Sequence, residues 1–432
     1  MANEQVSSGN VQDVLAILEP LIVQLDPADV FTPTSSLDFN VRGQCFRSPS
    51  FRDVLVRLLK FKSFEYDSDK KLATVGVGAT WVEVAQVCEM LIYSLVVLPV
   101  ARTPSVGVGG SIIHGGYSWM TGELGCISDS INFVNAEVVK YDGTVVMAAD
   151  GLDLLWALRG SGGSFSSHRS SSPLLTDIWS GMILVPRHDL HAIARQIVRF
   201  ISTPQHPRVN FLMYSVQRQL LHAILDESDL HSVNGDMIAL HVYDACGESH
   251  GRAAFAWALE IPGAIDRTIV ADTKGIVDMQ QNVTSLRGTF KSFDAIPMAT
   301  AQVDEETILR AMEWQDKIKA IDKDIHGRTM VLFEFLVLAE VAWPRRLDDK
   351  HYILIITGCP ADETAEQERT ALKIAVNAPG EVFGEFEHYS ILPAGISEFH
   401  DPKKAYGTHW ERLVKLRKKY DPELKFKAII NP

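Results

Sequence analysis

The sequence has little positive charge, few cysteines and no long run of apolar residues. Its 41 lysines and arginines are outnumbered by 54 acidic residues, which gives a net charge of −13 at pH 7. A surface of that sign repels nucleic acids and anionic membranes, so we expect neither as a partner. No stretch of roughly 18 uncharged apolar residues occurs, and we therefore expect no membrane span.

The five cysteines are scattered, odd in number and without a Cys-x-x-Cys pair. This usage is typical of reduced thiols in a cytosolic protein, and it predicts neither a disulfide framework nor a metal site. The first 25 residues have no basic segment, and Glu19 and Pro20 interrupt their apolar part, unlike a secretory signal. We therefore expect a cytoplasmic protein without a metal. The sequence leaves the oligomeric state open.

The length of 432 residues favours two domains. In the first part, residues 10–26 and 81–94 have helical periodicity, and residues 133–148 predict a β-hairpin with Asp142-Gly143 as its turn. After about residue 187, helical segments alternate with long β runs. The predicted helices span residues 190–202, 250–261 and 304–321, and the strands span residues 209–216, 236–245, 328–342 and 350–360.

Several of these β runs alternate polar and apolar residues, as half-buried antiparallel strands do. We therefore predict an α+β domain whose antiparallel sheet is covered by helices on one face. An amphipathic helix within residues 406–426 follows, and it ends at Asp421-Pro422.

Residues 101–131 contain seven glycines in clusters. Glycine lets the backbone come close to a ligand and adopt positive φ at little cost. Successive backbone N–H groups in such a loop form a concavity that binds anions. The segment therefore predicts a cradle for a flat or phosphorylated ligand.

Five segments, in this order along the chain, resemble the FAD-linked oxidases of the berberine-bridge-enzyme-like group, which have the vanillyl-alcohol-oxidase or PCMH-type fold. They read YDSDKKLATVGVGATWVEV, PSVGVGGSIIHGGYSWMTGELGCISDSI, AEVVKYDGTVV, DLLWALRGSGGSF and YGTHWERLVKLRKKYDPELKF. The resemblance implies an FAD-binding-type domain over residues 1–187 without its first strand. It also implies a substrate domain over residues 188–395, and a segment over 396–432 that returns to the first domain.

In that group the glycine segment lies against the flavin and its pyrophosphate. The resemblance therefore implies that any retained FAD would contact Val106, Gly107, Gly109, Gly110, Gly115 and Gly116. This chain departs from the pattern elsewhere. A VRGGGHS-like loop, whose histidine often bonds the flavin covalently, here ends in Gln44, Cys45 and Phe46. Thr103 stands where a second covalent link, through cysteine, is found in the group.

Two further departures concern backbone contacts to the flavin. A GGGYG-like stretch here begins with His114, and a short GNFGIVT-like strand is replaced by the longer, serine-rich residues 163–186. Taken together, the departures predict that the flavin has been lost, so we expect no cofactor. The alternative is FAD held without a covalent bond.

Candidate catalytic residues come from the strands and from the glycine segment. Glu334 stands alone in an apolar β run, where a carboxylate needs a partner or a raised pKa, as a general acid or base does. The alternative is a sheet-edge residue paired with an arginine. His241 and Tyr243 alternate with apolar neighbours and so share one face, which lines either a pocket or the covering helices. His114 replaces a loop glycine and can exchange a proton near neutral pH.

Four aromatic residues complete the candidate site. Tyr117 and Trp119 can stack on a flat ligand or fill the space of a lost flavin, and Tyr214 is open to the same two interpretations as His241. The predicted substrate-binding residues are Tyr117, Trp119, Tyr214 and Phe333.

Three functions remain open at this stage. A cavity enclosed by both domains would suit a non-redox cyclisation of a polyketide- or polyene-like substrate, by a Diels–Alder or Michael-type ring closure. Orientation and hydrogen bonds to a substrate carbonyl would drive that reaction. Fungal relatives of the oxidase group serve secondary metabolism, which the resemblance extends to this chain. The alternatives are an oxidase with non-covalent FAD, which oxidises an alcohol or closes a ring oxidatively, and an inactive binding or partner protein.

Overall fold

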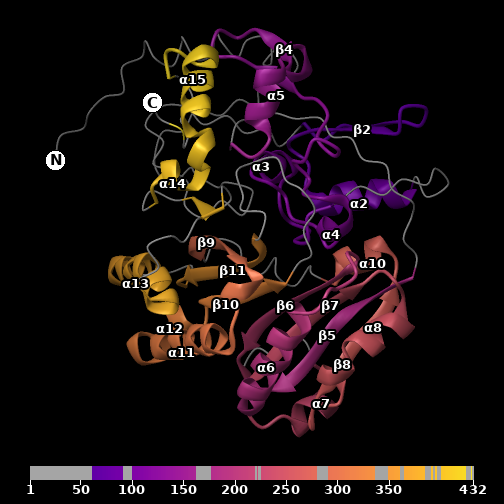
Figure 1. Cartoon of the computed structure of the whole chain (residues 1–432), viewed down its shortest axis with the longest axis vertical. Coiled ribbons are helices and arrows are strands. Elements are labelled where there is room, and N and C mark those ends of the chain that lie inside the picture. Colours follow the sequence, from indigo (N-terminus) through magenta and orange to yellow (C-terminus); the bar gives the residue numbers. More distant parts are fainter. Residues whose placement is uncertain are drawn as a thin grey trace.

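The computed structural model has two parts, which Figure 1 shows one above the other. The upper part is built from short strands and helices, and the lower part from a large sheet with helices. The predicted helix over residues 10–26, the loop at residues 41–46 and most of the serine-rich segment lie outside the described residues. The structure describes residues 61–90, 100–161, 177–218, 221, 225–279, 290–335, 349–360, 364–384, 391–392, 395–396, 400–424 and 430.

The upper part packs its short elements around a core that includes Trp81, Ile112 and Phe133, all fully buried. Asp142 and Gly143 form the hairpin turn as predicted, because Gly143 adopts a φ of 81°. The elements are β1 (Phe64–Asp67), β2 (Leu72–Val75), α2 (Trp81–Met90), α3 (Val108–Ile113), α4 (Thr121–Leu124), β3 (Glu137–Val139), β4 (Val145–Met147) and α5 (Leu152–Leu158).

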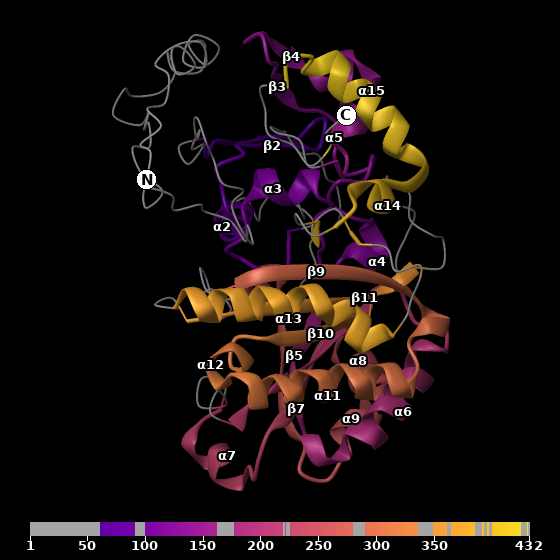
Figure 2. The same ribbon diagram turned by 90° about the vertical axis from the view of Figure 1, so that its left-hand side faces the viewer.

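The C-terminal segment returns to this upper part. It contains α14 (Pro402–Tyr406) and α15 (Trp410–Tyr420), and α15 lies beside α5 in both ribbon views (Figures 1 and 2). Trp156 of α5 packs against Tyr406 and Leu413, and Arg412 lies over the Trp156 ring at 3.7 Å from its centroid. An amphipathic face on the last helix therefore closes the upper core.

The lower part is a seven-stranded antiparallel sheet with strand order β8-β5-β7-β6-β10-β11-β9. Strands β6 and β7 coincide with the predicted runs at 209–216 and 236–245. The predicted fold class, α+β with an antiparallel sheet, is confirmed. The strands are β5 (Ile178–Pro186), β6 (Val209–Val216), β7 (Met237–Asp244), β8 (Ile265–Ala271), β9 (Phe290–Ala299), β10 (Met330–Phe335) and β11 (Asp349–Gly358).

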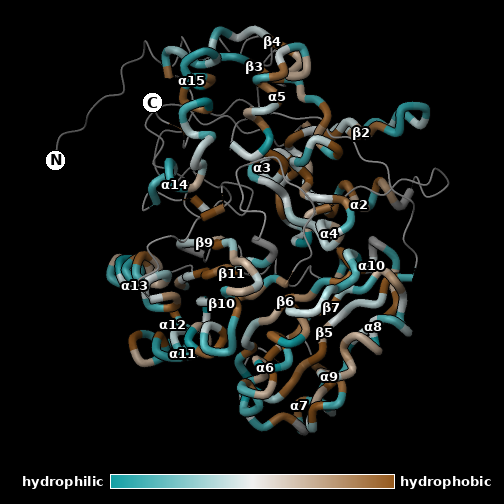
Figure 3. Tube along the Cα trace, viewed as in Figure 1, coloured by the Kyte–Doolittle hydropathy of each residue, from teal (hydrophilic) through white to brown (hydrophobic). Residues whose placement is uncertain are grey.

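Helices cover the face of the sheet that is turned away from the upper part (Figure 2). The buried side chains beneath them form the largest apolar cluster, with Ile183, Phe211, Leu240 and Ile353 among the strand residues. The apolar stretches of the strands stand out in Figure 3. The covering helices are α6 (Leu190–Ile201), α8 (Glu248–Ala254), α9 (Ala256–Leu259), α11 (Glu305–Ile321), α12 (Lys323–His326) and α13 (Ala365–Phe383). No helix in the described parts of the chain is long and apolar enough to cross a membrane.

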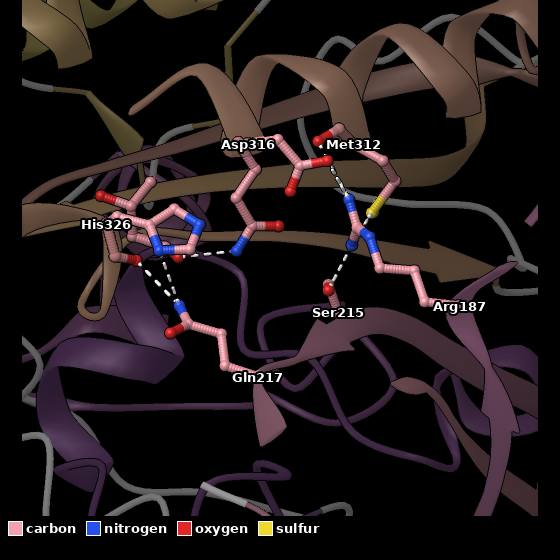
Figure 4. A network of polar contacts seen from close by, with 8 residues as sticks. Arg187, Ser215, Gln217, Met312, Asp316 and His326 are labelled. Atoms are coloured by element: carbon pink, nitrogen blue, oxygen red, sulfur yellow. Dashed lines mark hydrogen bonds and ion pairs between the residues drawn. The ribbon is translucent and has the colours of Figure 1, made fainter. Parts of the chain in front are cut away.

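A polar network fixes the long helix α11 to the ends of two strands (Figure 4). Arg187, directly after β5, donates to Ser215 of β6, and its Nη2 lies 2.7 Å from Asp316 of α11. Gln217 Nε2 contacts the Nδ1 atom and the carbonyl oxygen of His326, at 3.1 and 3.3 Å. These bonds orient the covering layer more specifically than apolar packing alone, because hydrogen bonds constrain direction.

The structure adds elements that periodicity did not reveal. Strands β8 and β9 were not predicted, and β5, which the predicted boundary at 187 left in the first part, pairs with β7 and β8. The predicted helix at 250–261 is divided at Phe255 into α8 and α9. Gly251 of α8 packs directly on the buried ring of Trp179. A larger side chain at position 251 would therefore force Trp179 or the helix to shift.

We expect Gly251→Ala to destabilise the protein by about 1–3 kcal/mol, because overpacking a filled core forces the neighbours to shift. A Cβ at this position would lie 2.2 Å from Trp179 Cε3. The matched control is Gly380→Ala in α13, where a Cβ would meet nothing within 4 Å. That change should stabilise by about 0.5–1 kcal/mol, since alanine restricts the unfolded chain. The urea midpoints of the two variants should move in opposite directions, and an unchanged midpoint for Gly251→Ala would contradict the packing described.

Candidate active site

The antiparallel register of the strands places four residues in a row across the sheet, and two of them are predicted site residues. His241 of β7 is opposite Leu212 of β6, Leu212 is opposite Glu334 of β10, and Glu334 is opposite Tyr352 of β11. Directly opposed residues point to the same face of a sheet. This row faces the upper part, since Phe333, next to Glu334, is buried under the helices on the other face.

A buried ion pair joins the two parts of the molecule at this row. Arg102, just before the glycine segment, donates through Nη2 to Oε2 of Glu334. The two side chains are only 10% and 4% exposed, so both charges are almost completely removed from water. One interpretation of the sequence places Glu334 at a sheet edge, paired with an arginine. The partner is present, but β10 is an interior strand.

Trp119 is the aromatic centre of the site. The Arg102 guanidinium lies 5.6 Å from the centroid of the Trp119 ring, a distance at which cations attract aromatic faces. The His241 ring is 5.0 Å away, and the Tyr243 ring stacks at 5.6 Å with an interplanar angle of 9°. Asn210 Nδ2 donates to the Trp119 carbonyl at 2.6 Å. The structure therefore brings Trp119, His241, Tyr243 and Glu334 together.

Burial keeps the titratable groups around this ion pair uncharged. Burial and, to a smaller extent, the nearby Arg102 charge lower the pKa of His241 from 6.5 to about 4, so its imidazole is neutral at pH 7. Burial also raises the pKa of Tyr243 well above its ordinary value and that of Tyr214 to about 12. Both tyrosines are therefore phenols at neutral pH and can donate a hydrogen bond. Tyr214 Oη donates to the sulfur of Met182 at 3.5 Å.

Several buried polar atoms at this site have no hydrogen-bond partner among the described residues. They are Arg102 Nη1, Trp119 Nε1, Asn210 Oδ1 and Tyr243 Oη. Buried polar atoms in proteins are almost always bonded to protein, water or ligand. A cluster of three donors and one acceptor, set between the glycine segment and the sheet, is what a polar substrate group requires. We therefore take this cluster, with Glu334 and His241, as the candidate active site.

Tyr117 and His114, also predicted as site residues, lie in other surroundings. Tyr117 stands 4.9 Å from the Tyr352 ring, in an apolar group that also contains Ala295 and Leu392. His114 is half-buried at the end of α3, and its Nδ1 lies 2.7 Å from the carbonyl oxygen of Gly110. Burial lowers the pKa of His114 below its ordinary value. Its described hydrogen bond ties it to its own helix.

Phe333 does not fit its predicted role in substrate binding. It is 1% exposed and belongs to the core beneath the helices, where its ring lies 5.9 Å from that of Phe335. Neighbouring residues of a strand point to opposite faces, so Phe333 and Glu334 cannot both face the upper part. The prediction is corrected on this ground.

The glycines of this segment have two roles, in packing of the chain and in leaving the backbone open. A Cβ at Gly109 would lie 3.1 Å from the Val77 carbonyl oxygen, and Gly116, at a φ of 69°, would clash with Ile127. These glycines serve the packing of the chain itself. A Cβ at Gly107 or Gly110 would meet nothing within 4 Å, so a ligand can approach the backbone there. The start of α3 therefore retains an open cradle of the kind the sequence predicted.

Arg102 is the site residue that sequence reasoning missed. It stands alone between apolar and turn residues in VARTPSV, without a periodicity or motif that marks it. Its partner is 232 residues further along the chain. Only the folded structure identifies this pair.

Replacing Glu334 by Gln should lower the free energy of unfolding by about 3–5 kcal/mol, because Arg102 is left buried without a counter-charge. The double variant Arg102→Met with Glu334→Leu should regain most of that loss, since an apolar pair of similar volume needs no ionic partner. Urea unfolding of the single and double variants measures this coupling. Additive losses in the double variant would show that the two side chains do not depend on each other.

The lowered pKa of His241 predicts a pH-dependent stability. The unfolded chain binds this proton at about pH 6.5, whereas the folded chain binds it only near pH 4. The unfolding free energy should therefore fall as the pH drops through that window, by roughly 3 kcal/mol at 1.36 kcal/mol per pH unit. His241→Gln should flatten this part of the profile, and the exposed control His188→Gln should leave it unchanged. A profile that His241→Gln does not alter would contradict a buried, neutral His241.

Known proteins resemble this chain in part of its sequence and in its fold. Residues 38–149 match the model of the FAD binding domain family. The chain is 29% identical over 174 residues to berberine bridge enzyme-like 7 of Arabidopsis thaliana, covering 38% of this chain and 32% of that protein. It is 32% identical over 165 residues to the FAD-dependent monooxygenase tpcD of Cochliobolus heterostrophus, covering 36% and 31%. The matched stretch spans about a third of each relative.

The fold extends further than the sequence match. Glucooligosaccharide oxidase from Acremonium strictum superposes with a TM-score of 0.68 at 17% identity, covering 88% of this chain and 82% of that one. At 17% sequence identity, this similarity shows a shared fold alone.

The expectation of no cofactor is wrong, because the FAD-binding domain match includes residues 41–46 with their substitutions. Backbone N–H groups remain when a glycine is replaced, so those substitutions do not by themselves exclude a bound flavin. Residues 38–149 therefore match the FAD binding domain family, and the chain is similar to berberine bridge enzyme-like proteins over about a third of its length and has the fold of the PCMH-type FAD oxidases.

Proposed function

We propose that the chain is an FAD-dependent oxidoreductase of secondary metabolism that holds its flavin without a covalent bond. The relatives named as berberine bridge enzyme-like and FAD-dependent proteins support the cofactor. Phe46 and Thr103 occupy the two positions at which the family forms covalent links, and neither side chain can form one. The reaction is the oxidation of an alcohol or an oxidative ring closure on a small, largely apolar molecule.

The residues present fit a flavin. The backbone from Val106 to Gly110 would hold it, because Gly107 and Gly110 are open to an approaching ligand and Gly109 seats the segment against Val77. Ser111 Oγ accepts a hydrogen bond from Trp81 Nε1 at 2.7 Å and donates one to the Gly107 carbonyl oxygen at 2.9 Å. These two hydrogen bonds fix the start of α3. When bound, the flavin supplies a hydride acceptor for the substrate.

The observation that carries this proposal is the cluster of unpartnered buried polar atoms around Trp119. The Tyr243 hydroxyl, a phenol at neutral pH, donates a hydrogen bond to the substrate oxygen. Neutral His241 accepts the proton that the substrate hydroxyl loses. Glu334 holds Arg102 in place, and the remaining Arg102 N–H group stabilises negative charge that develops on the substrate oxygen.

The apolar surroundings define the substrate class. Trp119, Leu212, Leu332 and Ile276 form one apolar cluster beside the polar atoms. Such a surface favours aromatic or polyene carbon skeletons over sugars, which require many hydrogen bonds. The non-redox cyclisation considered from the sequence depended on a lost flavin, and it is not retained.

We expect the purified protein to carry FAD that is released into solution when the protein is denatured. Gly110→Val should reduce the FAD content severalfold, because its side chain fills the open cradle, whereas Gly380→Val should not. Tyr243→Phe should keep its FAD. With the best substrate from a panel of allylic and benzylic alcohols, it should slow flavin reduction about ten- to a thousandfold. The measurements are flavin absorbance before and after denaturation and anaerobic flavin bleaching.

Two results would contradict the proposal. A colourless protein that does not take up added FAD would exclude the oxidoreductase function. Flavin that stays with the denatured chain would show a covalent bond.

A further inference from the structure

A second group of polar side chains lies at the turn from β7 to α8, away from the residues used above. Asp244 ends β7, Cys246 lies in the turn, and His250 lies in the first turn of α8 (Figure 1). One carboxylate oxygen, the Cys246 sulfur and one imidazole nitrogen all lie within 4.8 Å of one another. Three different metal-binding side chains therefore meet within seven residues of sequence.

Local backbone geometry holds this group in place. Asp244 Oδ1 accepts the Cys246 N–H at 2.7 Å, and its Oδ2 lies 2.6 Å from His250 Nδ1. Gly247, at a φ of 101°, turns the chain into α8, a conformation that other residues rarely adopt. The Asp244 carboxylate is fully buried, whereas Cys246 and His250 reach solvent. A cation can therefore enter from the exposed side and meet a fixed carboxylate.

A fourth side chain approaches the same sulfur from another loop. His206, three residues before β6, places its Nδ1 3.3 Å from Cys246 Sγ, and its ring centroid is 6.2 Å from that of His250. Ligand atoms on one zinc ion, at about 2.0–2.3 Å from the metal, lie roughly 3.2–3.7 Å from one another. To hold one ion, the 2.6 Å contact between Asp244 and His250 would open, and any wider separation among the three atoms, at most 4.8 Å, would close.

We propose that Asp244, Cys246 and His250 bind one Zn²⁺ ion, with the fourth position open to solvent. A set of sulfur, nitrogen and oxygen donors suits a borderline metal such as zinc and not Mg²⁺ or Ca²⁺, which prefer oxygen ligands alone. His206 contacts the sulfur and orients it, as neighbours of metal ligands commonly do. The ion fastens the β7–α8 turn, on the side of β7 opposite to Tyr243.

The test uses tag-free protein that has been stripped with a chelator and kept reduced. Competition with a chromophoric chelator should show one Zn²⁺ per chain, and Co²⁺ should give the near-ultraviolet charge-transfer band of a thiolate ligand. Cys246→Ser and His250→Ala should each lower the zinc affinity by about 100-fold or more, and His206→Ala by about tenfold. The control is His188→Ala, an exposed histidine elsewhere on the surface, which should bind zinc as the parent does.

Both ligand variants alter exposed side chains, so they should fold, and far-ultraviolet circular dichroism checks this. Zinc should raise the melting temperature of the parent and of His188→Ala but not of Cys246→Ser. Absence of zinc binding would overturn the proposal. Equal zinc affinity in the parent and in Cys246→Ser or His250→Ala would also overturn it, because the bound metal would then be adventitious. FAD content is measured separately, so failure of this site leaves the proposed oxidoreductase function untouched.

Discussion

The buried ion pair between Arg102 and Glu334 is the constraint on which the arrangement of the site depends. Each charge would be costly in this environment without the other, since an unpaired buried ion loses its hydration without compensation. The pair connects the start of the glycine segment to an interior strand of the sheet. The two parts of the chain must therefore dock in one register for either charge to be satisfied, and that docking brings Trp119 onto the sheet.

The same pair determines the electrostatic character of its surroundings. His241 lies close enough to Arg102 to be kept neutral, in addition to the effect of burial, and Tyr243 keeps its proton. A site with one compensated ion pair and otherwise neutral donors and acceptors suits the apolar substrates proposed above, because few charges need to be desolvated. Hydrogen bonds in such a setting act strongly on developing charge because little water competes for them.

The error about the cofactor has a physical explanation. The departures at 44–46, at Thr103 and at His114 are changes of side chains, whereas a pyrophosphate is held largely by backbone N–H groups. Losing a histidine or cysteine removes a covalent bond to the flavin and leaves the remaining contacts. Gly107 and Gly110, where the backbone is open, are unchanged from the pattern that the resemblance predicted. The family match and the second glycine segment both support a bound flavin.

Features that depend on local periodicity could be predicted from the sequence. The alternation in β7 placed His241 and Tyr243 on one face, and the apolar run of β10 marked Glu334 as a buried carboxylate. The same alternation, applied to Phe333, would have excluded that residue from the site. Five segments in family order gave the fold class, because strands and glycine turns leave patterns over short distances.

Contacts between groups that are distant in sequence depend on the folded chain. Arg102 has no local signature, and its partner lies 232 residues away. His206 reaches Cys246 from a separate loop, so the cysteine looked isolated in a sequence without a Cys-x-x-Cys pair. One face of β7 contacts Trp119 and the other is covered by helices. This assignment depends on how the sheet docks against the upper part. Periodicity identifies the two faces of a strand, but long-range packing decides what each face contacts.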